Sequence, residues 1–327
     1  MCDNKDTQKG EEKLSRNHFN TKENANAGRK LSSRIWKCRD YYIMLLPAVV
    51  YVILFHYAPM YGLQIAFKNY KVSLGVAGSP WVGFRNFTDF FGSYYFVTLL
   101  KNTLVLSLYA LVVGFPVPII VALVLNEMKG KFKKVVQTVL YAPHFISLVV
   151  LVSILNSMLS PSQGVVNTIL EMLGMERNYF MANPAYFPHL YVWSGVWQGM
   201  GWGAIIYLAA LSSVDPALHE AADIDGATRM QKIIHINLPT IMPTIIIMLI
   251  LRMGQIISVG YEKVYLMQNS MNIETAEVIS TYVYKRGILN SNYSFSAAVG
   301  LFNNVVNVIM VLLANWISRK VSDTSLF

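Results

Sequence analysis

Long apolar stretches alternate with polar segments along the whole chain. Six of these stretches reach the roughly 20 mostly apolar residues that a helix needs to cross a bilayer. They cover residues 43–67, 99–125, 135–159, 187–214, 239–267 and 297–317. The pattern predicts an all-α, polytopic membrane protein with six transmembrane helices. Because the number of spans is even, both termini are expected on the same side of the membrane.

The composition supports this class. Hydrophobic residues make up 54% of the 327 residues and charged residues only 14%, and the mean hydropathy is +0.41. Soluble globular domains carry about 25% charged residues. The chain is therefore too apolar for an ordinary soluble protein.

The positions of Lys and Arg predict the orientation of the spans. Of the 27 Lys and Arg residues, 18 lie before the first span, between the second and third, between the fourth and fifth, or after the sixth. Connections rich in Lys and Arg stay in the cytoplasm. Both termini are thus predicted to be cytoplasmic. The net charge of +9 reflects this topology, and no nucleic-acid partner is expected.

The polar ends of the chain are expected to lie outside the membrane. Residues 1–40 form a basic tail without apolar periodicity, which predicts disorder. No apolar region with a cleavage site precedes the first span, so no cleavable signal peptide is expected. Residues 41–320 are predicted to form one transmembrane domain and residues 321–327 a short cytoplasmic tail. Cys2 and Cys38 fall on the cytoplasmic side, where disulfides are rare, and are interpreted as incidental thiols.

The connection between the fourth and fifth spans, about residues 215–239, carries the most distinctive motif. Asp215-Pro216 favours a helix start, because Asp caps free backbone N–H groups and proline has none to satisfy in the first turn. Residues 217–224 then predict a short helix, and 229–235 a second one. Gly226 suits the left-handed position that ends a helix. The candidate coupling residues are Glu220, Ala221, Ala222, Asp225, Gly226, Leu238 and Pro239.

This pattern resembles the EAA loop of permease subunits of binding-protein-dependent ABC importers: Glu-Ala-Ala, three residues, Gly, nine residues, then Ile-x-Leu-Pro. The resemblance implies a type I ABC importer permease fold in a prokaryotic cell membrane. It also implies four partner chains, namely a second related permease in a heterodimer, two ATP-binding subunits that dock on the loop, and an extracytoplasmic solute-binding protein. Transport would proceed by alternating access driven by ATP.

Other segments resemble sugar permeases more narrowly. Residues 83–87 and 101–104 resemble the entry to the core domain of sugar-type ABC permeases. Residues 251–254, 260–264 and 277–284 are similar to the branch that imports oligosaccharides from complex, often uronate-containing polysaccharides. The resemblance implies an oligosaccharide substrate.

Enzyme motifs are absent from the sequence. It has no phosphate-binding Gly-x-x-x-x-Gly-Lys-Ser/Thr loop, no His-Glu-x-x-His and no paired cysteines at metal spacing, and its six histidines are scattered. We therefore expect no catalytic residue, no metal site and no cofactor in this chain. ATP and Mg would be bound by the partner ATPase subunits.

Arg252 is the main candidate for the substrate pathway. It lies 13 residues after Pro239, so at a 1.5 Å rise it sits roughly 20 Å along the predicted helix, at membrane depth. A charge there costs about 2.5–3.5 kcal/mol and should face protein or water. The central parts of the six spans contain no Asp or Glu. The counter-group could be Glu262, backbone carbonyls, water, the partner permease or an acidic substrate.

Further polar residues lie at comparable depth. Gln255 and Glu262 would share the helical stripe of Arg252, and Gln198 would enter from the fourth span. Asn303 and Asn307 lie one turn apart on the sixth. These side chains predict a solvated cavity that binds hydroxyl groups, but amides also hydrogen-bond packed membrane helices, and both interpretations remain open.

The fourth span has two different faces. Glycines at positions 195, 199 and 203 predict a seam for close helix packing. Trp193 and Trp197 lie on the other face. They are candidates for stacking a sugar ring, although tryptophans also form aromatic belts at membrane interfaces.

Together these observations predict a transmembrane permease subunit that forms half of the translocation pathway for an oligosaccharide and performs no chemistry itself. The alternatives are an ABC permease for another solute class or, less favoured, a secondary transporter or channel. An intramembrane enzyme is disfavoured by the missing motifs.

Overall fold

The computed structural model describes residues 38–321. The chain divides into two compact units, residues 1–63 and 64–327, which are treated separately below. The predicted N-terminal disorder, Cys2 and the tail from residue 322 lie outside the described residues. Cys38 is exposed and forms no disulfide within the described part of the chain.

The first unit is helical throughout its described part. Helix α2, Arg39–Val52, continues into a π-helical turn, Ile53–Tyr57, and a 3-10 segment, Ala58–Phe67, that runs into the second unit. Arg39–Phe67 is 29 residues long and apolar enough to cross a membrane, and none of its most apolar window is buried by protein. Such an exposed apolar helix is expected to contact lipid or another subunit.

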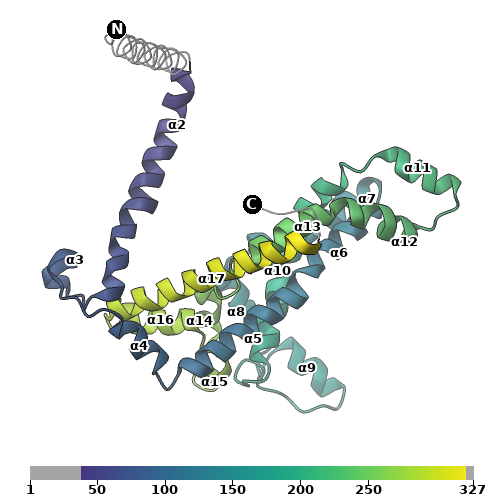
Figure 1. The fold of residues 1–327 in the computed structure, drawn as a ribbon. Helices are drawn as coiled ribbons and strands as arrows, with labels where there is room; N and C mark the ends of the chain where they lie inside the picture. The colour runs from purple at the N-terminus through teal and green to yellow at the C-terminus, as the bar shows by residue number, and fades with distance from the viewer. Residues whose placement is uncertain (1–37, 322–327) are drawn as a thin grey trace, which may run out of the picture. The chain divides into compact units, whose positions relative to one another are not determined.

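The second unit contains the remaining helices, which are drawn in Figure 1. The α-helices are α3 Gly75–Gly78, α4 Arg85–Phe91, α5 Phe96–Gly114, α6 Pro116–Glu127, α7 Gly130–Tyr141, α8 Leu148–Met158, α9 Val165–Met172, α10 Phe187–Leu211, α11 Pro216–Ile224, α12 Arg229–Lys232, α13 Leu238–Met253, α14 Tyr261–Met267, α15 Ile273–Ala276, α16 Ile279–Tyr284 and α17 Tyr293–Val321. Short 3-10 or π-helical turns cover Val72–Leu74, Ala142–Phe145, Ile233–Asn237 and Lys285–Leu289. The extended structure among the described residues is one antiparallel bridge between Lys68 and Trp81.

The predicted number of spans is compatible with this architecture. Within residues 38–321, four helices are long and apolar enough to cross a membrane, and six spans result if each of two bent helix pairs counts as one. The second predicted span is the helix Phe96–Glu127, which passes through Pro116, and the sixth is the helix Tyr293–Lys320. The all-α class predicted from the sequence is confirmed.

The third predicted span, 135–159, is not a straight helix. The chain bends by 99° between the segments Gly130–Phe145 and Leu148–Met158. Pro143 lies at this bend, where its missing N–H and its ring oppose a continuous helix. Ser147 then caps α8, because its Oγ accepts a hydrogen bond from the backbone N of Val150 at 3.4 Å.

The fifth predicted span, 239–267, starts earlier and ends earlier than expected. One helical segment runs from Arg229 through a π-helical turn to Met253, so the second short helix predicted at 229–235 does not end before Pro239. The chain then leaves the helix at Gly254 and re-enters one only at Tyr261. A Cβ atom on Gly254 would lie 2.6 Å from Cγ2 of Val311, so α17 approaches the backbone closely where α13 ends.

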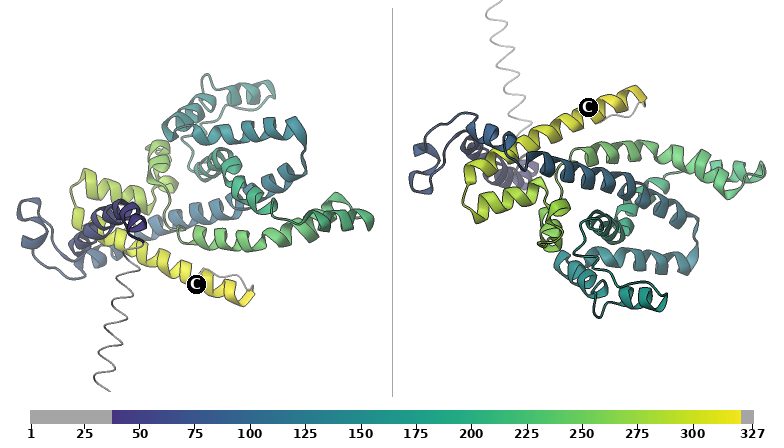
Figure 2. Two further views of the ribbon diagram at one scale, coloured as in Figure 1. Left: turned by 90° about the horizontal axis from the view of Figure 1, so that it is seen from above. Right: turned by 90° about the horizontal axis from the view of Figure 1, so that it is seen from below.

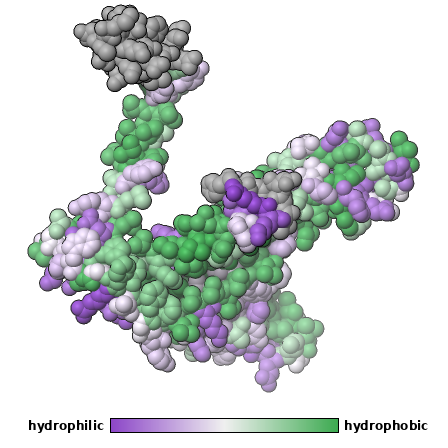
Figure 3. Space-filling model, in the orientation of Figure 1, coloured by the Kyte–Doolittle hydropathy of each residue, from purple (hydrophilic) through white to green (hydrophobic). Residues whose placement is uncertain are grey.

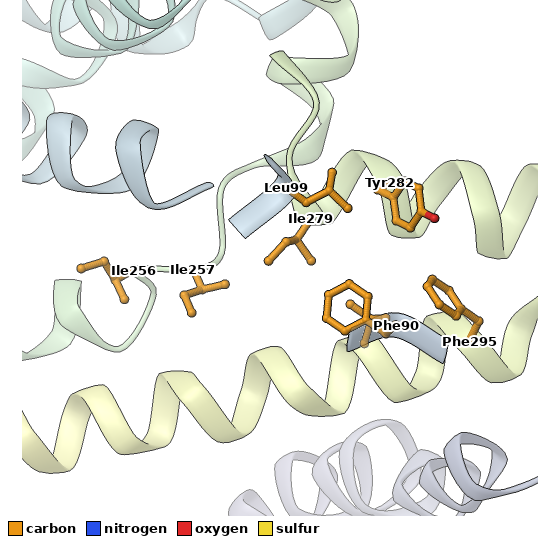
Figure 4. Close-up of a cluster of buried hydrophobic side chains, with 8 residues drawn as sticks. Phe90, Leu99, Ile256, Ile257, Ile279, Tyr282 and Phe295 are labelled. Atoms are coloured by element: carbon orange, nitrogen blue, oxygen red, sulfur yellow. The ribbon is translucent and has the colours of Figure 1, made fainter. Parts of the chain in front are cut away.

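Buried side chains connect this break to the core. Ile256 and Ile257 follow α13 and belong to one cluster of buried apolar side chains with Phe90, Ile279 and Phe295, which Figure 4 draws. These five residues are at most 8% exposed. The non-helical segment is therefore anchored by its own apolar residues.

Apolar residues also cover much of the surface of the second unit. Along α17, Val305, Val308, Leu312 and Trp316 are all about half exposed, and Figure 3 shows an apolar surface over this helix. Helices α11 and α12 extend to one end of the unit, as the views in Figure 2 show.

Candidate functional site

A cavity of about 410 Å³ lies inside the second unit, between the α5–α6 junction, α10, α13 and α14. Helix α10 supplies one whole wall. The lining residues are Ala110, Gly114, Phe115, Pro118, Tyr191, Val192, Gly195, Val196, Gln198, Gly199, Met200, Gly203, Tyr207, Met248, Arg252 and Lys263. None of these residues is an Asp or Glu, whereas two carry a positive charge.

A second cavity of about 170 Å³ adjoins the first, and Ala110, Tyr191 and Arg252 line both. It is closed by the non-helical segment after α13, which contributes Gln255 and Ser258. From α5, Ser107 presents a buried hydroxyl that has no hydrogen-bond partner among residues 38–321. This smaller cavity therefore offers an amide and two hydroxyls beside the Arg252 side chain.

Arg252 lies in the last turn of α13 and is exposed to these cavities. The four ion pairs found among residues 38–321 do not include it. Glu262, predicted as a possible counter-group, is exposed and lines neither cavity. The helical stripe that would join Arg252 to Glu262 does not form, because α13 ends at Met253.

Lys263 is a second cation of the larger cavity, and the sequence analysis did not select it. Its side chain is only 7% exposed. The ammonium nitrogen donates a 2.8 Å hydrogen bond to the carbonyl of Tyr191 and lies 4.8 Å from the centre of the Tyr191 ring. The sequence signal that could have found it is a second basic residue in the predicted fifth span, eleven positions after Arg252.

Gln198 lies where it was predicted, on the cavity wall of α10. Its Nε2 donates a 2.7 Å hydrogen bond to the carbonyl of Ile146, in the bend before α8. The amide thus links α10 to an otherwise irregular segment. Its Oε1 remains available to accept a hydrogen bond.

Asn303 and Asn307 do not line either of these cavities. Asn307 joins α17 to the segment after α13, because its Nδ2 donates to Ser258 Oγ at 2.9 Å and its Oδ1 accepts from Ile257 N at 3.3 Å. Asn303 lines a separate apolar hollow of about 300 Å³, and its buried Oδ1 has no partner among residues 38–321. Helix linkage therefore accounts for the contacts of Asn307.

Trp193 and Trp197 face away from the cavities and are 53% and 43% exposed. Trp193 Nε1 donates a 3.0 Å hydrogen bond to the hydroxyl of Tyr109, which is also 2.9 Å from His189 Nδ1. These aromatic residues form a polar cluster between α10 and α5 on the outer surface of the unit.

The glycines of α10 do not form the packing seam that their spacing predicted. A Cβ on Gly203 would lie 3.1 Å from Pro118, so this glycine does pack closely on α6. Gly199 has open space in front of it, and Gly195 faces the Lys263 ammonium. The tightest contact belongs to Gly201, whose Cβ would lie 2.1 Å from the carbonyl oxygen of Leu140.

The segments 101–104 and 277–284, which resemble sugar permeases, contact one another. Asn102 Nδ2 donates to the carbonyls of Glu274 and Glu277 at 2.8 and 2.9 Å. Thr103 Oγ1 accepts from Ile279 N at 3.0 Å. These bonds fix the start of α16 against α5, so these residues shape the core instead of lining a cavity.

The α11–α12 connection has the local structure that its sequence predicts. Asp215 Oδ1 accepts from Ala217 N at 2.9 Å and caps α11. Gly226 has φ +74° and follows the helix end, with Ala227 N bonded to Ala222 O at 2.9 Å and Gly226 N to Asp223 O at 3.2 Å. This pair of bonds is a Schellman motif, in which the left-handed residue favours glycine.

The second half of this connection is also ordered by side chains. Thr228 and Gln231 form a capping box at the start of α12. Lys232 Nζ pairs with Asp223 across the turn, and this hydrogen bond lowers the pKa of the Asp223 carboxyl below its ordinary value. Glu220, Ala221 and Asp225 are exposed. The turn therefore presents a short, stiffened helix on the surface of the unit.

At the base of the connection, Asn237 is fully buried. Neither its Oδ1 nor its Nδ2 has a hydrogen-bond partner among residues 38–321. An unpaired buried amide costs about 1–3 kcal/mol. Leu238 and Pro239 follow it as the first residues of α13 and are half-buried and exposed, respectively.

Comparison with known proteins finds relatives in sequence and in structure. Residues 114–323 match the family model described as the binding-protein-dependent transport system inner membrane component. The chain is 44% identical over 287 residues to the polygalacturonan/rhamnogalacturonan transport system permease protein YteP of Bacillus subtilis, which covers 88% of this chain and 89% of YteP.

Two solved structures are similar over nearly the whole chain. One is a bacterial ABC transporter involved in the import of the acidic polysaccharide alginate, which matches with a TM-score of 0.82 and 44% identity over 89% of this chain and 99% of the other. The other is a bacterial alginate ABC transporter in complex with an alginate pentasaccharide-bound periplasmic protein, with a TM-score of 0.83 and 43% identity over 90% and 99% of the two chains.

Proposed function

The chain belongs to the family of binding-protein-dependent transport system inner membrane components and is a permease of an ABC importer for sugars or oligosaccharides, and we propose that its cargo carries uronate carboxylates. Two relatives support an acidic cargo by their names, since polygalacturonan and alginate are both polymers of uronic acids.

The charge of the larger cavity is the observation that carries this proposal. Arg252 and Lys263 both line it, and no Asp or Glu is among its lining residues. A cavity with two cations and no acidic partner favours an anionic ligand. A guanidinium also presents a planar fork that binds a carboxylate through two parallel hydrogen bonds.

Neutral groups of the same two cavities suit the rest of a sugar. Gln198 Oε1, Gln255 and the Ser107 hydroxyl can exchange hydrogen bonds with sugar hydroxyls. Because Arg252 is exposed, solvent weakens an ion pair at this residue, which then releases its ligand more readily than a fully buried pair would. Arg252 would thus bind the cargo and still release it.

Movement of the pathway would be driven from the α11–α12 connection. We infer that Glu220, Ala221, Ala222, Asp225 and Gly226 form the docking surface for an ATP-binding subunit, on the cytoplasmic side together with both termini. Two such subunits would bind ATP and Mg, and this chain would perform no hydrolysis. A second, related permease would complete the pathway, and an extracytoplasmic binding protein would deliver the oligosaccharide.

Uptake by the reconstituted complex tests the cargo. Proteoliposomes that contain both permeases, the ATPase and the binding protein should accumulate uronate-containing oligosaccharides. The variant Arg252→Gln keeps most of the side-chain length and removes the charge. It should lose acidic uptake by about tenfold or more relative to any neutral oligosaccharide that the system accepts.

A matched variant tests whether the loss of any arginine from this chain changes uptake. Arg286→Gln removes a guanidinium that lies over the Tyr282 ring and lines none of the three cavities described above. It should leave the ratio of acidic to neutral uptake unchanged. Equal loss of both cargos in Arg252→Gln would assign Arg252 to structure, and a wild-type complex that carries only neutral sugars would refute the acidic cargo.

Co-purification tests the assembly separately. Tagged copies of this chain should recover a second, different permease in a one-to-one ratio. A transport-competent complex that contains two copies of this chain and no other permease would contradict the heterodimer.

A further inference from the structure

Lys263 sits in an unusual position for a charged side chain. It lies on the short helix α14 and reaches across to α10, where its Nζ donates to the Tyr191 carbonyl at 2.8 Å. The side chain is more than nine-tenths buried and lies on the wall of the larger cavity. The small exposed part of this residue therefore faces the cavity.

A glycine makes room for this ammonium. Gly195 is four residues after Tyr191 on α10, so the helical hydrogen bond of its N–H uses the same carbonyl that Lys263 binds. A Cβ atom on Gly195 would lie 3.1 Å from Lys263 Nζ, which is tighter than an ordinary contact. Gly195 thus forms a notch in α10 that any larger residue would fill.

The ammonium keeps unused bonding capacity. It carries three N–H donors, of which the Tyr191 carbonyl takes one and the Tyr191 ring provides a further favourable contact. The ion pairs found among residues 38–321 do not include Lys263. A buried cation without an anionic partner is unfavourable, so an anion in the cavity would be bound well.

A purely structural role does not require this charge. Helix α14 is already held by its neighbours Val264 and Met267, which are buried with Phe187 of α10 in one apolar cluster. A neutral donor could also bind the Tyr191 carbonyl and would avoid the desolvation of an ammonium. The charge itself needs another explanation.

We propose that Lys263, seated in the Gly195 notch, is a second carboxylate-binding group of the cavity and determines, with Arg252, the selectivity for acidic over neutral oligosaccharides. The inference rests on the proposed acidic cargo. Arg252 and Lys263 come from different helices and line one cavity, so they can bind the carboxylates of two sugar residues in one chain, whereas a neutral oligosaccharide gains from neither charge.

Two variants of the notch test the proposal in the reconstituted complex. Lys263→Met keeps the length of the side chain and removes its charge, and the ratio of acidic to neutral uptake should fall about 10- to 100-fold. Gly195→Ala leaves Lys263 in place but pushes its ammonium aside, and should lower the ratio by a smaller factor. Comparing the two variants separates an effect on cargo binding from an effect of losing a charged residue on folding, because Gly195→Ala changes no charged residue.

Gly199→Ala is the matched control. Gly199 lies one turn after Gly195, lines the same cavity, and has no atom within 4 Å of the position of an added Cβ. The added methyl group therefore takes the same volume from the cavity without touching the ammonium. Any effect on uptake should be equal for acidic and neutral cargo, so the ratio should match the wild type.

The possible outcomes are distinct from those of the cargo proposal. An unchanged ratio in Lys263→Met, or equal loss of both cargos in Lys263→Met and Gly195→Ala, would overturn the role of Lys263. If Arg252→Gln still lowers the ratio in the same assay, the acidic cargo stands while the Lys263 inference fails. If Lys263→Met does not assemble, the ratio in Gly195→Ala compared with Gly199→Ala decides the matter.

Discussion

Replacing Gly226 by Val should uncouple the permease from its ATPase. Gly226 occupies the left-handed position, with φ +74°, at the end of α11. The turn is closed by two backbone hydrogen bonds, from Ala227 N to Ala222 O and from Gly226 N to Asp223 O. Any residue that cannot adopt this conformation must break one or both bonds and redirect α11.

The size of the effect follows from the backbone alone. A Cβ atom at Gly226 would meet nothing within 4 Å, so the substitution causes no collision. The left-handed conformation costs an L-residue about 1–2 kcal/mol, and a β-branched residue is among the least tolerant. Such a change lowers the population of the native turn about 5- to 30-fold relative to its alternatives.

The assay is ATP hydrolysis by the reconstituted complex, stimulated by the loaded binding protein. We expect the stimulation to fall several-fold in Gly226→Val while the subunit still inserts into the membrane. Gly226→Asn is the control, because Asn adds a side chain of similar size but tolerates the left-handed region. Stimulation at the wild-type level in Gly226→Val, or equal losses in both variants, would refute the reasoning.

Three further outcomes are expected. Asn237→Leu replaces a buried amide that has no partner among residues 38–321, so it should raise the melting temperature of the purified complex; a lower one would mean that another subunit satisfies Asn237. Asn167→Ala removes hydrogen bonds that the buried Asn167 side chain makes to Leu159, Ser160 and Asn178, and should make residues 159–178 sensitive to limited proteolysis; unchanged cleavage would refute it. The Lys232 hydrogen bond lowers the pKa of Asp223, so this ion pair should stabilise the turn at neutral pH, and the stabilisation should be lost as pH falls through that lowered pKa. Asp223→Asn should remove this acid dependence of stimulated ATPase activity.

The π-helical turn Ile233–Asn237 links the α11–α12 connection to α13 without a break in the helix. Such turns loosen the regular hydrogen-bond pattern and allow the following proline, Pro239, to sit within a continuous helical segment. Movement of α12 would therefore be passed to Arg252 along one continuous helical segment.

Local sequence determined much of this protein. Chain length and apolar runs determine a membrane helix, because each backbone polar group in a bilayer must be satisfied within its own segment. The capped start of α11 and the left-handed Gly226 depend on residues within one or two turns, and both have the form that their sequence predicts. Gln198 and Arg252 could also be placed at cavity depth by counting residues along a helix.

Tertiary structure decided the rest. The end of α13 at Met253 depends on α17 crowding Gly254 and on a core that buries Ile256 and Ile257, and none of these contacts is local in sequence. Extending the helix through this segment placed Glu262 beside Arg252, which the fold does not do. The partnership of Lys263 with Gly195 joins residues 68 positions apart. A residue count cannot show which side chain faces a glycine on another helix, because that depends on how the helices pack.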